Sequence, residues 1–195
     1  KHHKKALILG TGGASKAIAF ALKKNDIKFK FVSRKSKSKK VLIAGSVHPL
    51  YRKVVKDIVN NQGITLDIIP IDSKALSLDH SVLSQYEEQD YAALVIPQPN
   101  FFGSLEDVNS LTDWGQRHKM LVIGVVNPMA MAMLAPPGEW GENGADIAVG
   151  EGQPFGLPLA SGGPYFGFMC CKQQHVRQMP GRIIGRTVDL DGKEG

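Results

Sequence analysis

The sequence has little cysteine and no long apolar run. Of its 195 residues only Cys170 and Cys171 are cysteines, and because they are adjacent they cannot form an ordinary structural disulfide bridge. No run of 18 apolar residues is present, so no membrane-spanning helix is predicted. The N-terminal KHHKK is not followed by an apolar segment, so no secretory signal is predicted. These features predict a reduced, cytoplasmic protein. Its hydrophobic content of 43% suffices for one large or two small domains.

Catalytic and metal-binding patterns are also missing. No Ser/His/Asp or Cys/His arrangement can be identified, and with only vicinal cysteines a zinc site is not predicted. The histidines without metal-ligand spacing are His2, His3, His80, His118 and His175.

Acidic residues are scarce in the first part of the chain. Residues 1–60 carry 16 Lys and Arg against Asp26 and Asp57, a net charge of +14, whereas residues 61–195 carry 8 against 16 acidic residues, a net charge of −8. Such asymmetry can indicate a surface for nucleic acid or anionic ligands. The basic run 34–40 contains no aromatic residue on which bases could stack. A solvated helix face with a lysine-rich connector is therefore preferred, and nucleic-acid binding is the minor alternative.

Residues 5–32 follow the order strand, glycine turn, helix, strand. The predicted elements are a strand at 5–9, a turn at 10–14, a helix at 15–24 and a strand at 27–32. The helix carries an apolar stripe formed by Ala17, Ile18, Ala21 and Leu22.

A glycine turn in this context predicts a site for a nucleotide pyrophosphate. Glycines let the backbone approach the phosphates, and the helix that follows offers free N–H groups. An acidic residue normally follows the second strand and binds the ribose 2′-hydroxyl, but this strand ends in a basic pair that would bind a 2′-phosphate. The pattern therefore favours NADP over NAD, with a turn that merely tightens a strand–helix corner as the alternative. The candidate cofactor-binding residues are Gly10, Thr11, Gly12, Gly13, Ala14, Ser33, Arg34 and Lys35.

The phrases HKKALILGTGGASKAIAFALKK and FKFVSRK resemble the start of the NADP-binding domain of shikimate dehydrogenase. In that family the catalytic Lys and Asp belong to a preceding substrate domain, which has no counterpart here, so shikimate oxidation is not expected.

A polar connector at 34–40 leads directly into the next strand. A parallel crossover needs a dozen or more residues, and seven cannot supply one. The strands at 27–32 and 41–47 are therefore expected to pair antiparallel, to lie apart in one sheet, or to belong to separate units. We interpret the connector as the seam of a natural or engineered fusion between a partial NADP-binding unit (1–38) and a second unit (39–195). A lysine-rich hairpin loop is the alternative.

The second unit alternates strands and helices, which predicts an α/β fold with a mainly parallel sheet and helices on both faces. Strands are predicted near 41–45, 65–70, 92–96, 121–126 and 146–149, helices near 49–61, 78–87 and 105–118, and a further strand within 165–171. His48 is expected to make a contact at a helix start, with a ligand-facing role as the alternative. The turn Asn100–Gly103 is expected to fill the core rather than to touch a ligand.

The phrases VLIAGSVHPLYR, PNFFGSLEDV, GADIAVGEGQPFGLPLASGGPYFGF and VRQMPGRIIGRTVD resemble glycine dehydrogenase (decarboxylating) subunit 1, the alpha-type part of the P-protein of the glycine cleavage system. The resemblance implies the large-domain core of a fold-type I pyridoxal-phosphate (PLP) transferase. That family releases CO₂ from glycine and passes the aminomethyl group to a lipoyl carrier protein.

The residues that would hold PLP covalently are absent from this second unit. A PLP enzyme needs a lysine for the Schiff base and an acid for the pyridinium nitrogen, but no lysine lies between Lys119 and Lys172. By the resemblance, Gln153 takes the place of the lysine, and Asn127 replaces an aspartate at a strand end. Asp146 is expected to be the only acid near the last strands and to be structural.

The chain is therefore interpreted as a glycine dehydrogenase-like protein without independent catalysis and with no catalytic residue assigned. Covalently bound PLP is not expected, and a beta-type P-protein subunit is the expected partner, with an oligomer possible. The alternatives are an NADP-binding module and an inactive chimeric α/β scaffold.

Overall fold

The computed structural model describes residues 5–9, 28–32, 38–158, 165–180 and 188–194. Contacts divide the chain into two compact units, Lys1–Lys37 and Ser38–Gly195. The predicted glycine turn at 10–14, the predicted helix at 15–24 and the basic residues 33–35 all lie outside the described residues.

The first unit contains two parallel strands, β1 (Lys5–Leu9) and β2 (Lys28–Val32). They pair in register, with Lys5 opposite Lys28 and Leu9 opposite Val32. The two predicted strands are confirmed, and their parallel pairing is the one that the order strand, helix, strand requires.

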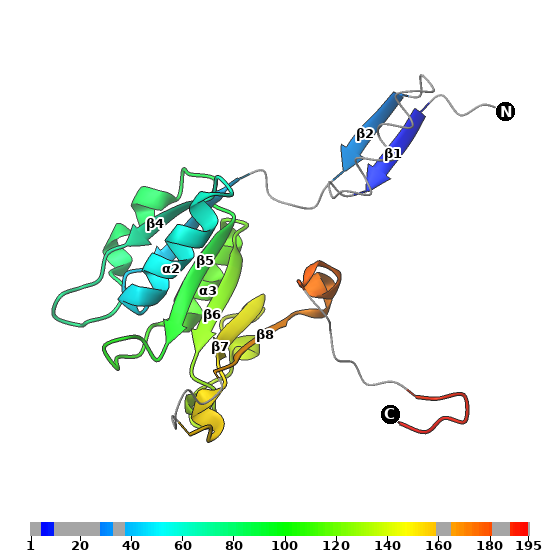
Figure 1. Cartoon of the computed structure of the whole chain (residues 1–195). Coiled ribbons are helices and arrows are strands. Elements are labelled where there is room, and N and C mark those ends of the chain that lie inside the picture. The colour runs from blue at the N-terminus through cyan, green and yellow to red at the C-terminus, as the bar shows by residue number, and fades with distance from the viewer. Residues whose placement is uncertain (1–4, 10–27, 33–37, 159–164, 181–187, 195) are drawn as a thin grey trace. The chain divides into compact units, whose positions relative to one another are not determined.

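The second unit is built on a six-stranded sheet in the order β4-β3-β5-β6-β7-β8 (Figure 1). All neighbouring strands are parallel except β7 and β8, which are antiparallel. The strands are β3 (Lys40–Ala44), β4 (Thr65–Ile69), β5 (Ala93–Gln98), β6 (Leu121–Val126), β7 (Ile147–Glu151) and β8 (Gly167–Cys171). The mainly parallel α/β sheet predicted from the sequence is confirmed. The chain leaves β3 toward one edge for β4 and then returns to the other side of β3 for β5, which makes a topological switch point between β3 and β5.

Two α-helices are described, α2 (Pro49–Asn60) and α3 (Val108–Arg117). The helix predicted at 105–118 starts at Val108, because the side chain of Asp107 accepts a hydrogen bond from the Ser110 amide at 3.1 Å and caps the helix. The longest helix described has 12 residues, and no helix in the described ranges is long and apolar enough to cross a membrane.

The helix predicted at 78–87 is wrong in type, since His80–Tyr86 forms the 3₁₀ helix η1. Leu83 is the only buried residue of this segment, so little packing favours a longer α-helix. The other short 3₁₀ helices are η2 (Ala130–Ala132), η3 (Pro137–Glu139), η4 (Gln153–Phe155) and η5 (Gln173–Gln178).

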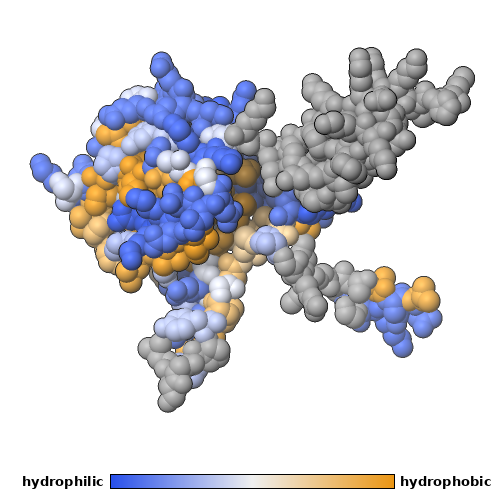
Figure 2. Space-filling view, turned by 45° about the horizontal axis from the view of Figure 1, so that its top comes forward, coloured by the Kyte–Doolittle hydropathy of each residue, from blue (hydrophilic) through white to orange (hydrophobic). Residues whose placement is uncertain are grey.

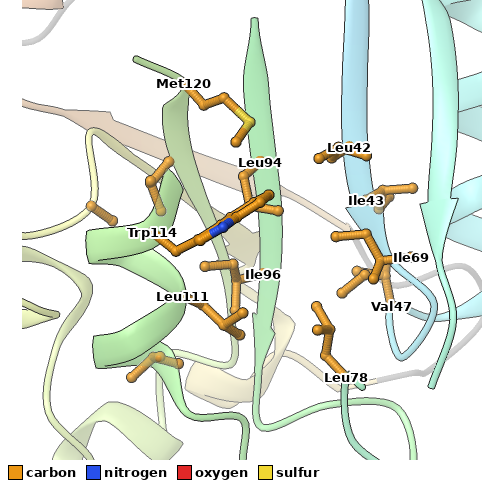
Figure 3. Close-up of a cluster of buried hydrophobic side chains, with 14 of the residues drawn as sticks. Leu42, Ile43, Val47, Ile69, Leu78, Leu94, Ile96, Leu111, Trp114 and Met120 are labelled. Carbon is orange, nitrogen blue, oxygen red and sulfur yellow. The ribbon is translucent and has the colours of Figure 1, made fainter. Parts of the chain in front are cut away.

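Helix α3 packs on one face of the sheet, against β5 and β6. Leu111 and Trp114 of the helix are 0% and 5% exposed and pack toward Leu94 and Ile96 of β5, which are both fully buried (Figure 3). Gly115 lets the helix approach closely, since a Cβ there would lie 3.1 Å from the Leu94 side chain.

The other face of the sheet is only partly covered. The side chains that alternate with the buried ones along β5, β6 and β7, such as Val95, Ile123 and Val149, are partly exposed. Helix α2 lies beside β4 on this face, and none of its residues is fully buried. Val54 and Ile58 of α2 are 54% and 60% exposed, and the space-filling view shows hydrophobic residues at the surface among hydrophilic ones (Figure 2). An open apolar pocket results.

Candidate functional site

The pocket has a volume of about 920 Å³ and lies over the partly covered face of the sheet, reaching the carboxyl ends of β3, β5, β6 and β7. Parallel α/β sheets bind ligands outside these strand ends, at a switch point such as the one between β3 and β5. The floor is apolar and includes Val41, Val95, Pro97, Ile123, Val125 and Val149. The rim is polar or aromatic and includes His48, Tyr51, Asn100, Phe101, Asn127 and Glu151.

His48 stands at the point where β3 passes into α2. Its Nδ1 accepts a hydrogen bond from the Leu50 amide at 3.1 Å, which caps the helix and confirms the predicted contact at the helix start. The ring also lines the pocket, with ring centroids 4.9 Å from Tyr51 and 4.6 Å from Phe101. Because Nδ1 accepts, the neutral ring carries its proton on Nε2 and can donate from there.

A tyrosine and a glutamate are joined across the pocket. The Tyr51 hydroxyl on α2 donates to Oε1 of Glu151, at the end of β7, over 2.7 Å. Burial, and after it the hydrogen bond to the Glu151 carboxylate, raise the pKa of Tyr51 to about 12. The tyrosine is therefore a neutral donor at physiological pH, and the pocket carries one carboxylate.

Tyr51 and Glu151 are not among the site residues predicted from the sequence. The statement that Asp146 is the only acid near the last strands is wrong, because Glu151 terminates β7 at the opposite end. The signal was available in the sequence, since four strand residues separate the two acids and place them at opposite ends of the same strand.

In the turn Asn100–Gly103, which follows β5, the two phenylalanine rings point outward. Phe101 and Phe102 are 49% and 42% exposed, so the expectation that this turn fills the core is wrong for both rings. The buried residue is Asn100, at 7% exposure. Its Oδ1 accepts hydrogen bonds from the amides of Phe102 and Ser104, both at 3.0 Å, and this folds the backbone so that the rings project away.

The positions singled out for a PLP site lie at or near the pocket. Asn127 lines it, and its Oδ1 accepts a hydrogen bond from the Met129 amide at 2.9 Å. Gln153 begins η4 directly after β7. Neither side chain can form an imine.

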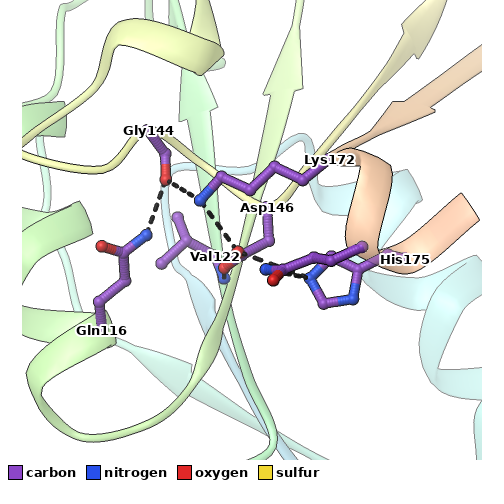
Figure 4. A network of polar contacts seen from close by, with 7 residues as sticks. Gln116, Val122, Gly144, Asp146, Lys172 and His175 are labelled. Carbon is purple, nitrogen blue, oxygen red and sulfur yellow. Dashed lines mark hydrogen bonds and ion pairs between the residues drawn. The ribbon is translucent and has the colours of Figure 1, made fainter.

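Asp146 lies just before the amino end of β7 and does not line the pocket. Its contacts join β6 to the segment that follows β8 (Figure 4). Its Oδ2 accepts from the Val122 amide at 2.9 Å, and its Oδ1 lies 3.1 Å from Lys172 Nζ and 3.7 Å from His175 Nε2. Lys172 also donates to the Gly144 carbonyl at 2.9 Å. These contacts make Asp146 a structural residue.

The described lining of the pocket carries no basic side chain other than His48. None of the described residues that line it is a lysine or an arginine. Within the described ranges no group of three His, Cys, Asp or Glu side chains could hold a metal ion. The pocket therefore offers hydrogen-bond donors, one engaged carboxylate and an apolar floor.

The family model of the glycine cleavage system P-protein matches residues 12–195. The match runs through residue 38, where the sequence suggested a junction between two proteins, and the interpretation of the first residues as shikimate dehydrogenase receives no support from it.

Individual relatives agree with the family match. The chain is 58% identical over 186 residues to a probable glycine dehydrogenase (decarboxylating) subunit 1 of Alcanivorax borkumensis, covering 95% of this chain and 39% of that protein. It is 62% identical over 158 residues to the protein of the same name from Nitrosospira multiformis, covering 81% of this chain and 35% of that protein. The chain thus spans well under half the length of these curated relatives.

Solved structures share the fold. A crystal structure of glycine decarboxylase (P-protein) of the glycine cleavage system, in inhibitor-bound form, superposes with a TM-score of 0.70 at 35% identity, covering 82% of this chain and 35% of that one. A C-DES mutant with glycine covalently linked to its PLP cofactor superposes with a TM-score of 0.52 at 15% identity, covering 83% and 43%. The second likeness concerns the fold alone.

Proposed function

Because the chain belongs to the glycine cleavage system P-protein family, we propose that it contributes an alpha-type, non-catalytic part of a glycine decarboxylase. In this proposal a second P-protein subunit supplies the reactive lysine. The observation that carries it is the composition of the pocket, whose described lining has no amine that could form an imine.

The pocket does not fit covalently bound PLP. The coenzyme needs an amine for its aldehyde, cationic or N–H groups for its phosphate and an acid for its ring nitrogen. The described lining contains no lysine or arginine, Asn127 is an amide, and the Glu151 carboxylate is already engaged by the Tyr51 hydroxyl. We therefore derive no catalytic step through PLP at this site.

Direct measurement separates this proposal from an independently active enzyme. The purified chain is mixed with PLP, reduced with borohydride and digested, and pyridoxyl adducts are mapped by mass spectrometry. We expect no stoichiometric adduct on any lysine of the second unit and no release of CO₂ from glycine. Adding a beta-type P-protein subunit from a relative should give CO₂ release, and the pyridoxyl adduct should then lie on that subunit.

The family name of the relatives also supports a partner. Relatives called subunit 1 imply a second subunit, so we expect the chain to associate with a beta-type P-protein. Analytical ultracentrifugation of the two proteins, separately and mixed, measures this association. Independent sedimentation of the two proteins at micromolar concentration, together with CO₂ release by this chain alone, would contradict the proposal.

A second candidate function concerns the first unit. The parallel pairing of β1 and β2 favours a nucleotide-binding unit, in which Gly10–Ala14 would bind pyrophosphate and Arg34 and Lys35 a 2′-phosphate. A ligand at a hundredfold excess over Kd stabilises the folded state by about 2.7 kcal/mol. NADP should raise the melting temperature more than NAD does, and the double variant Arg34→Ala, Lys35→Ala should abolish the difference. Equal shifts with both nucleotides, or none with either, would remove this candidate.

A further inference from the structure

Glu106 is a buried carboxylate that stands just before α3, and it is only 5% exposed. Its Oε2 accepts a hydrogen bond from the Leu78 amide at 2.8 Å. Its Oε1 accepts from Asn100 Nδ2 at 2.8 Å and from the Ser46 hydroxyl. Its own amide donates to Gln98 Oε1 at 3.0 Å. Within the part of the chain that the structure describes, no lysine, arginine or histidine forms an ion pair with it.

Two of the groups that donate hydrogen bonds to Glu106 cannot become acceptors. The Leu78 group is a backbone N–H, which only donates. The Asn100 amide is fixed because its Oδ1 already accepts from the Phe102 and Ser104 amides, which leaves Nδ2 to face Glu106. Both oxygens of residue 106 must therefore accept hydrogen bonds, one from the Leu78 amide and the other from Asn100 Nδ2.

Two of the residues that Glu106 holds, Ser46 and Asn100, connect to the pocket mouth, by which we mean the lining residues His48, Asn100 and Phe101. Ser46 lies in the turn between β3 and α2, and its carbonyl accepts a hydrogen bond from the Phe101 amide at 2.9 Å. Asn100 starts the turn that carries Phe101. Two residues after Ser46, the His48 ring meets Phe101 edge-on, with centroids 4.6 Å apart and an interplanar angle of 76°.

We propose that Glu106 is a positioning residue, whose buried carboxylate ties the end of β3 to the turn after β5 and so sets the His48–Phe101 pair at the pocket mouth. It does not line the pocket itself and acts through Ser46 and Asn100. This inference concerns the geometry of the mouth, and it stands independently of the proposed function.

Replacing the carboxylate by an amide of the same shape gives a clear test. In Glu106→Gln one of the two oxygens becomes an NH₂ group, which must face either the Leu78 amide or Asn100 Nδ2. Two buried donors would then oppose each other, and one contact must break. The mouth should open at Ser46 or at Asn100, and the ring pair should separate.

The readout is the ring current that Phe101 exerts on His48. Proton–carbon NMR spectra of the histidine rings are recorded for the full chain, with His48→Gln used to assign the His48 signals. Phe101→Leu gives the His48 shift that corresponds to loss of the ring. Glu106→Gln should move the His48 signals in the same direction as Phe101→Leu, by at least half as much. Ser46→Ala, which removes one of the three hydrogen bonds, should cause a smaller shift in that direction and serves if Glu106→Gln does not fold.

Thr112→Val is the matched control for the loss of a buried polar group. Thr112 is fully buried in α3, and its Oγ1 has no hydrogen-bond partner among the described residues. This variant should leave the His48 signals in place whatever its effect on the free energy of unfolding. His48 signals that stay at their wild-type positions in Glu106→Gln and Ser46→Ala, while Phe101→Leu moves them, would overturn the assignment. A His48 shift in Thr112→Val as large as that in Glu106→Gln would also overturn it.

Discussion

Removal of the Asp146 side chain should destabilise the second unit through two separable losses. Asp146→Ala leaves the amide of Val122, a fully buried residue, without its acceptor, which costs about 1–3 kcal/mol. The ion pair with Lys172 adds about 1 kcal/mol, because the Lys172 side chain is 29% exposed and keeps its bond to the Gly144 carbonyl. The free energy of unfolding should therefore fall by about 2–4 kcal/mol, a decrease in melting temperature of roughly 5–15 °C for a unit of this size.

The amide variant distinguishes the two losses. Asp146→Asn keeps an acceptor for the Val122 amide but turns its NH₂ group toward Lys172, so it loses the ion pair and the hydrogen bond to Lys172 and should cost about 1 kcal/mol. Urea denaturation followed by fluorescence of the buried Trp114 and Trp140 measures both variants. A loss below about 0.5 kcal/mol for Asp146→Ala, or an equal loss for the two variants, would refute the structural role derived from these contacts.

Three further predictions concern a helix cap, a close packing contact and a titrating side chain. Asp107→Ala should lower the free energy of unfolding by about 1 kcal/mol, while Asp107→Asn should not. Hydrogen bonding to Ser110 lowers the pKa of Asp107, so the contribution of Asp107 to the free energy of unfolding should be complete above about pH 4 and should disappear as the pH falls through the lowered pKa. Urea titrations at several pH values measure this, and a contribution that does not change with pH would contradict it. Gly124→Ala puts a Cβ 2.9 Å from the Trp140 ring and should lower the free energy of unfolding by about 1–3 kcal/mol, measured by thermal unfolding. The same substitution should cost less in a Trp140→Phe background, and equal costs in the two backgrounds would count against this packing. Burial, and after it a hydrogen bond, raise the pKa of Tyr51 to about 12, so the stability that this shift provides should be complete below about pH 10 and fall as the pH rises toward 12. The variant Tyr51→Phe should not show this fall. An ordinary pKa for Tyr51 in a tyrosinate absorbance titration would refute the burial argument.

The sheet could be predicted from the sequence because its strands are short apolar runs separated by turn residues. Leu121–Val126 was predicted with its observed bounds, and the other strands with errors of one or two residues at their ends. The segment His80–Tyr86 was misjudged because its apolar spacing is helical, whereas only Leu83 is buried and the segment forms a 3₁₀ helix. Local pattern does not contain the packing that decides between the two.

The site was only partly predictable, because half of it depends on pairing across the fold. His48 could be identified from its position between a strand and a proline. The Tyr51–Glu151 hydrogen bond joins residues 100 positions apart, and it follows only once the order of β3, β5, β6 and β7 is known. The outward rings of Phe101 and Phe102 were misjudged because the Asn100 side chain, rather than the apolar rings, occupies the interior. Buried amides that satisfy backbone N–H groups leave no periodic signal in a sequence.

The central claim is that this chain does not hold PLP covalently. The direct measurement is absorbance of the purified chain with PLP, followed by borohydride reduction and mapping of pyridoxyl-lysine by mass spectrometry. We expect no stoichiometric imine absorbance and no single modified lysine in residues 38–195. One lysine of this range carrying a stoichiometric pyridoxyl group, with CO₂ released from glycine by the chain alone, would contradict it.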